Sequence, residues 1–164
     1  MSKSLLLAAA LIVVSTLVFA QPRSTASSAE TANVSVAKQW YEAFNTKNTA
    51  LIEQIIADTW TDIPSPPGTP PGPVALKKTL IALTTSFPDL HLQIEDVIEA
   101  GDKVVVRSVI TGTQREAFFG IPSRGRRMSI QAVDIHEIKD GKILRTWHTE
   151  DWMTGLRQLG AIGS

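Results

Sequence analysis

The spacing of hydrophobic residues predicts helices in the first half of the folded region. Val36, Trp40 and Phe44 follow one another at intervals of four residues, which places them on one face of a helix. Apolar residues within residues 51–56 predict a short second helix. Pro73 suits the first turn of a third helix, which we expect to end near residue 87, just before Pro88.

The period of the pattern changes to two after residue 90, which is typical of strands with one buried face. We expect strands over residues 90–95, 103–113, 128–138 and 143–151, and a helical turn over residues 152–159. Helices followed by an antiparallel meander predict an α+β fold, in which three N-terminal helices pack on one face of a curved sheet.

Residues 1–20 have the pattern of a secretory signal peptide. Lys3 precedes an apolar run, and Val18 and Ala20 occupy the −3 and −1 positions of a cleavage site before Gln21. About 15 apolar residues are short for a membrane span of about 20. We therefore expect export to the periplasm or the outside of the cell.

The rest of the chain has the composition of a short tether and one domain. Residues 21–33 are rich in Ser, Ala and Thr, which predicts a disordered tether. Residues 34–164 suit a single domain. The Pro-rich segment 64–73 could be a linker between two domains, but the residues before it are too few to fold alone. We therefore expect it to be a loop at the mouth of a pocket.

The overall charge argues against two classes of partner. The chain has 16 basic and 16 acidic residues, so it has no electrostatic footprint for nucleic acid or an anionic membrane. We expect neither partner once the signal peptide is removed.

The stretch from Asp134 to Asp151 contains two of the three histidines and predicts a hairpin that turns at residues 140–141. A tight two-residue turn would place Asp134 opposite Trp147. A three-residue loop would place Asp134 opposite Thr146. We favour this loop because it separates the residues of the hairpin better into two distinct faces. One face then carries Asp134, His136, Thr146, His148 and Glu150, and the other carries Trp147.

Several motifs together resemble the SnoaL-like polyketide cyclase family, whose members are often called ester cyclases. They are YEAFN (41–45), PPGTPPG (66–72), FPDL (87–90), GDKVVVR (101–107), TGT (111–113), FFGIPSRGRR (118–127) and DGKI followed by Trp147. The resemblance covers residues 36–161. It implies the cone-shaped fold named after nuclear transport factor two, with a cavity lined by the concave sheet face and with no cofactor or metal.

The resemblance also implies an acid/base site, with a departure from the family pattern. The family closes a polyketide ring by an intramolecular aldol step, in which an inward carboxylate is assisted by a histidine. The carboxylate position falls on His148 and the histidine position on Asp134, so the pair is exchanged. Asp62 stands near the Pro-rich loop, where relatives often have a histidine.

We therefore expect His148 and Asp134 to be catalytic, in a pocket for a small apolar carbonyl or polyketide-like ligand. The further pocket residues are expected to be His136, Thr146, Glu150, Arg107 and Trp60. Structural alternatives are an internal hydrogen-bonded pair for His148 and Asp134, a position at the open rim for His136, a solvated Glu150, and an ion pair for Arg107.

Two other functions remain open. The first is non-catalytic binding of a small hydrophobic ligand. The second is an epoxide-hydrolase-like site, which needs an Asp–Arg–Asp arrangement and is disfavoured because Val109 lies two residues after Arg107. We expect a homodimer through the outer sheet face around Val133, Ile135 and Trp147.

Overall fold

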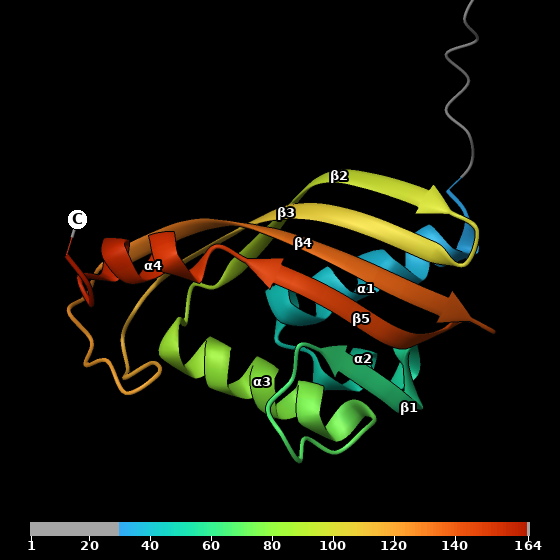
Figure 1. Ribbon diagram of the computed structural model, residues 1–164, viewed down its shortest axis with the longest axis horizontal. Helices are drawn as coiled ribbons and strands as arrows, with labels where there is room; N and C mark the ends of the chain where they lie inside the picture. Colours follow the sequence, from blue (N-terminus) through green and yellow to red (C-terminus); the bar gives the residue numbers. More distant parts are fainter. Residues whose placement is uncertain (1–29, 164) are drawn as a thin grey trace, which may run out of the picture.

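The computed structural model describes residues 30–163, which form a curved five-stranded sheet with the strand order β1-β5-β4-β3-β2. The strands β2, β3, β4 and β5 are antiparallel neighbours, and β1 runs parallel to β5 at the edge (Figure 1). The bounds are β1 (Ile56–Ile63), β2 (His91–Ala100), β3 (Lys103–Thr113), β4 (Arg127–Lys139) and β5 (Lys142–Glu150).

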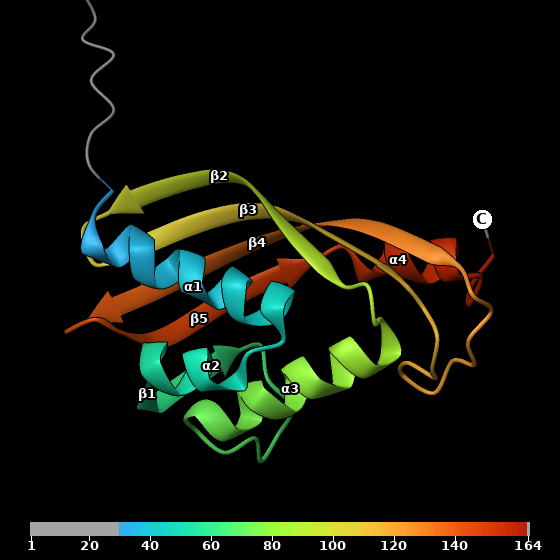
Figure 2. The same ribbon diagram turned by 180° about the vertical axis from the view of Figure 1, so that it is seen from behind.

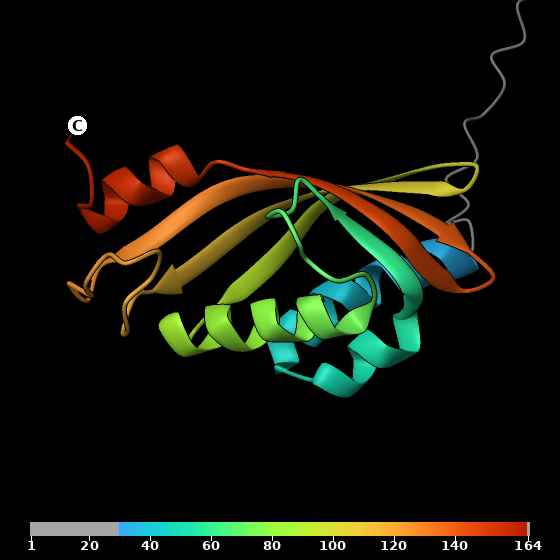
Figure 3. The ribbon, with the colours of Figure 1, turned by 60° about the horizontal axis from the view of Figure 1, so that its bottom comes forward.

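Three helices lie on the concave side of this sheet, and a fourth follows β5. They are α1 (Ala32–Thr46), α2 (Thr49–Ile55), α3 (Pro73–Ser86) and α4 (Trp152–Leu159). Figure 2 shows α1 running along the sheet, and Figure 3 shows the sheet arching over α1, α2 and α3. The predicted α+β fold is confirmed. Within residues 30–163, no helix is both long and apolar enough to cross a membrane.

Helix α1 begins where a side chain can cap it. The Thr31 hydroxyl accepts a hydrogen bond from the Val34 amide at 3.2 Å, which satisfies one free N–H of the first turn. The helix therefore starts two residues inside the segment 21–33 that was predicted to be a tether. The predicted signal peptide and the first part of that tether lie outside the described residues.

The sequence pattern did not predict strand β1. Ile56 was assigned to the second helix, yet it begins β1, which pairs with β5 through Asp62 opposite Thr146 and Ile63 opposite Trp147. The sheet is therefore antiparallel apart from this edge. The strand is short of apolar residues, and nothing local indicates its pairing, because the parallel partner is more than 80 residues away.

Alternation along β3 and β4 decides which side chains enter the concavity. Val106 and Ser108 are buried, so Arg107 between them points to the outer face. There its guanidinium forms an ion pair with Asp96, with an N–O distance of 2.6 Å. Arg107 therefore lies away from the pocket in which it was expected, and it takes its alternative role as a partner of a carboxylate.

The hairpin joining β4 and β5 combines a tight turn with a bulge. Asp140 and Gly141 both have positive φ, 51° and 74°, and form a two-residue turn between paired lysines. A register shift then leaves Leu144 unpaired, which places Asp134 directly opposite His148. The predicted pairing was wrong by two positions along β5. The predicted sorting into an inner and an outer face holds, because the difference is an even number of residues.

Candidate functional site

A small cavity lies between the concave face of the sheet and helices α1 and α3. Its volume is about 70 Å³, and its walls are mainly apolar. Four of its residues are titratable: Asp62, Asp134, His148 and Glu150. The other lining residues are Trp40, Phe44, Leu76, Thr79, Leu83, Leu90, Leu92, Ile110 and Trp152, so neither Lys nor Arg is among the described residues that line it.

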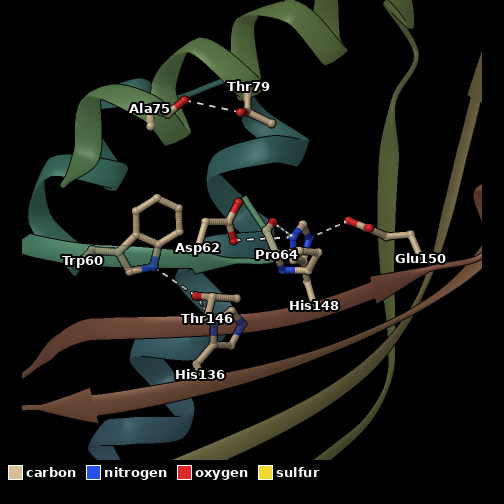
Figure 4. Close-up of polar contacts among 9 residues, drawn as sticks. All are labelled: Trp60, Asp62, Pro64, Ala75, Thr79, His136, Thr146, His148 and Glu150. Carbon is tan, nitrogen blue, oxygen red and sulfur yellow. Dashed lines mark hydrogen bonds and ion pairs between the residues drawn. The ribbon is translucent and has the colours of Figure 1, made fainter. Parts of the chain in front are cut away.

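The ring of His148 lies between two hydrogen-bond acceptors. Its Nδ1 is 3.0 Å from Oε1 of Glu150, and its Nε2 is 3.0 Å from the carbonyl oxygen of Pro64 (Figure 4). A neutral imidazole has one donor nitrogen, whereas the imidazolium donates from both. The arrangement is thus complete when His148 is protonated.

The surroundings of His148 stabilise its positive charge. The hydrogen bond to Glu150 raises its pKa to about 9, assisted by the Pro64 carbonyl and by Asp62, while burial opposes the shift. An oxygen of Asp62 lies 3.7 Å from Nε2. The cavity therefore holds a fixed cation near neutral pH.

Asp134 faces His148 across the β4–β5 pair and is 7% exposed. The Tyr41 hydroxyl donates a hydrogen bond to its Oδ2 at 2.5 Å. Burial raises the pKa of Asp134 to about 6, although the bond from Tyr41 acts in the opposite direction. A carboxylate whose pKa lies near the working pH can both accept and return a proton.

Sequence reasoning missed two residues of this site. Tyr41 was considered only as part of the YEAFN motif, yet its hydroxyl reaches Asp134, and burial together with that carboxylate raises its pKa above the usual range. Asp62 lines the cavity from β1, and burial raises its pKa. The alternation of Trp60 and Asp62 on one side of a strand was the available signal for Asp62.

Three of the expected pocket residues form a buried network beside the cavity. The Trp60 indole N–H donates to the Thr146 hydroxyl at 3.1 Å, and Nδ1 of His136 lies 3.1 Å from the same oxygen. Burial lowers the pKa of His136 to about 3, so its ring is neutral. The three residues connect β1, β5 and β4, and none of them is among the residues that line this cavity.

The titratable cluster is poorly suited to a metal ion. In the arrangement described, both nitrogens of His148 carry protons and have no lone pair to donate. Within residues 30–163, no group of three His, Cys, Asp or Glu side chains has the geometry of a metal site.

The fold has counterparts among known proteins. A family model described as SnoaL-like polyketide cyclase matches residues 35–159. The chain belongs to the SnoaL-like polyketide cyclase family. The resemblance found in the motifs is therefore confirmed, and no curated protein matches this SnoaL-like chain.

Solved structures similar to this SnoaL-like protein cover most of its length. TsrD from Streptomyces laurentii is 27% identical with a TM-score of 0.75, over 81% of this chain and 98% of its own. A proposed polyketide cyclase from Bacillus cereus is 33% identical with a TM-score of 0.70, over 80% and 83%. IdmH from Streptomyces antibioticus, also a proposed polyketide cyclase, is 28% identical with a TM-score of 0.69, over 78% and 98%.

Proposed function

We propose that this SnoaL-like protein performs acid/base chemistry without a cofactor on a small apolar carbonyl compound. One observation carries the proposal. Asp134 is a buried carboxylate whose pKa is raised to about 6, and it lines an apolar cavity next to the His148 imidazolium. Perturbed titratable groups that face a cavity are typical of catalytic sites.

The reaction begins with a proton transfer from carbon to Asp134. The carboxylate removes a proton from the carbon next to the carbonyl, and the electron pair of that C–H bond moves into the carbonyl to form an enolate. The positive charge of His148 stabilises the enolate oxygen, which competes with the Pro64 carbonyl for the Nε2 proton.

The second half of the reaction returns the proton. The enolate carbon attacks another carbonyl of the same molecule, and Asp134 gives its proton to the alkoxide that forms. If no second carbonyl is within reach, Asp134 returns the proton to carbon. In both cases the protein ends in its starting protonation state, and no cofactor is consumed.

The test is exchange of the α-protons of small ketones in D₂O, followed by NMR. We expect exchange by the wild-type protein and a loss of about 10²- to 10⁴-fold in Asp134→Asn. Asp96→Asn is the matched control, because Asp96 lies on the outer face beside Arg107. Exchange by Asp134→Asn at the rate of the control would refute the role of Asp134.

A non-catalytic binding function is favoured by one observation. Both ring nitrogens of His148 already have partners within the protein, Glu150 and Pro64. The exchange assay separates the two functions, since a binder would take up ketones without catalysing exchange. An epoxide-hydrolase-like site is not proposed, because Arg107 lies on the outer face of the sheet.

We also propose that the protein is exported, on the strength of the N-terminal sequence pattern. N-terminal sequencing of the protein from the periplasm or medium should then begin at Gln21. Recovery of the uncut chain from the cytoplasm would contradict this proposal.

We further propose a homodimer through the outer sheet face. Val133 is 39% exposed there, and the half-buried Trp147 lies under the guanidinium of Arg145, 5.5 Å from the ring centre. Light scattering should give twice the monomer mass, and Val133→Lys should restore the monomer. A monomeric wild-type protein would rule the dimer out.

A further inference from the structure

A second cavity lies under the Pro-rich loop, next to the one that holds Asp134. Its volume is about 260 Å³. The two cavities share the side chains of Asp62, Leu76 and Thr79, which form the wall between them. The other residues that line it are Trp60, Ser65, Pro66, Thr69, Pro70, Ala75 and Lys78.

The size of the first cavity shows why the second matters. Ligand sites for small molecules usually have about 300–1,000 Å³, and 70 Å³ holds little more than a carbonyl group and its neighbours. The second cavity is more than three times larger, so the two together reach the lower end of that range. A ligand whose reactive end lies beside Asp134 has room for the rest of its length under the loop.

Three of the polar side chains around the second cavity are satisfied within the protein, and Asp62, Ser65 and Lys78 also line it. The Thr69 hydroxyl donates to the Pro66 carbonyl at 2.7 Å, and the Thr79 hydroxyl donates to the Ala75 carbonyl at 3.3 Å (Figure 4 shows the latter). The indole N–H of Trp60 is bound to Thr146. Together with Leu76, Ala75 and the prolines of the loop, these three residues present mainly carbon to an occupant, which suits an alkyl chain.

The loop over this cavity is held in place by the same elements that form the site. The Gly72 amide donates to the Trp60 carbonyl at 2.9 Å, and the Pro64 carbonyl accepts from His148. The prolines of the loop restrict its backbone further. A cavity that is already formed binds a chain without the entropic cost of ordering the loop.

We propose that the cavity under the Pro-rich loop is a subsite for the alkyl tail of the ligand. The tail passes the wall of Asp62, Leu76 and Thr79, while the carbonyl end stays beside Asp134 and His148. The substrate class is thus an extended aliphatic ketone or acyl compound rather than a compact one. This inference rests on the proposed function at Asp134.

The experiment measures the affinity of linear methyl ketones, from acetone to 2-decanone, by calorimetry on the full chain. Burial of each added CH₂ stabilises the complex by about 0.8 kcal/mol, so we expect affinity to rise about fourfold per carbon. In Ala75→Trp the indole should fill the second cavity, and the rise should stop after the shortest ketones. Ala82→Trp is the matched control, since Ala82 is exposed on the same helix and should keep the rise.

A second variant separates loss of the subsite from damage to the helix. Thr69→Phe fills the cavity from the loop, and it should stop the rise as Ala75→Trp does. Affinity that does not depend on chain length in the wild-type protein, or that rises equally in both filled variants, overturns the subsite and leaves the role of Asp134 standing. If no ketone binds at all, the subsite and the proposed ligand class are both wrong.

Discussion

The wild-type protein should become less stable as the pH rises from about 6.5 to about 9. Replacing His148 by Gln should abolish this dependence of stability on pH. The pKa of His148 is raised from the ordinary value of 6.5 to about 9, chiefly by the hydrogen bond to Glu150. The folded protein therefore binds this proton more tightly than the unfolded chain does. The resulting stabilisation is complete below pH 6.5 and disappears as the pH rises through 9.

The size of the effect follows from the shift and from the exposure of the pair. A rise in pKa from 6.5 to about 9 corresponds to about 3 kcal/mol, at about 1.4 kcal/mol per pH unit. The side chains of His148 and Glu150 are 23% and 22% exposed, so solvent screening reduces this to about 2 kcal/mol. Asp134, with a pKa of about 6, and His136, with a pKa of about 3, change charge mainly below this window.

The measurement is the free energy of unfolding in urea at pH 6 and pH 9.5, followed by circular dichroism at one protein concentration. The wild-type protein should lose about 2 kcal/mol between the two values, and His148→Gln should lose less than about 0.5 kcal/mol. His91→Gln is the matched control, because His91 is exposed on β2, and it should behave like the wild type. An equal loss in His148→Gln and the wild type would refute the proposed imidazolium.

Three further predictions concern the same region. Tyr41→Phe removes the hydrogen bond that lowers the pKa of Asp134, so the acidic limb of the α-exchange rate should move to higher pH; an unchanged profile would contradict this. Gly72→Ala should cost about 1–3 kcal/mol in urea unfolding, because its φ is +86° and the new Cβ would lie 2.7 Å from the Asp58 carbonyl oxygen. Gly68→Ala has a similar φ of +83° but open space, so the excess cost in Gly72→Ala isolates the clash, and equal costs would argue against it. Isobutyrate should bind at least about tenfold more weakly than 3-methyl-2-butanone, its uncharged isostere, because the cavity has three carboxylates and one imidazolium, and calorimetric affinities that match would refute this charge argument.

Much of the fold could be predicted because its signals are local. The four-residue spacing of Val36, Trp40 and Phe44 marks α1, and the alternation from Asp134 to Glu150 marks the inner face of the hairpin. Alternation assigns each residue of a strand to one face of the sheet. An error in the predicted pairing by an even number of positions leaves that assignment unchanged. The inward direction of Asp134 and His148 was therefore predicted correctly, although their pairing was not.

The environment of each titratable group could not be predicted in the same way. Pro64 is 84 residues from His148 in sequence, and it reaches the ring because β1 joins the edge of β5. Tyr41 is 93 residues from Asp134 and reaches it from helix α1. Partners so distant in sequence leave no periodic pattern to recognise.

Apart from strand β1, the sequence by itself determined the kinds of element and their order, and it also determined the inner face of the hairpin and the family to which the chain belongs. The tertiary structure decided that His148 meets two acceptors and is charged, that Asp134 is buried against Tyr41, and that His136 is neutral in the core. The physical reason is that element formation depends on neighbours a few residues away. A pKa depends on burial and on charges that come together when distant segments pack.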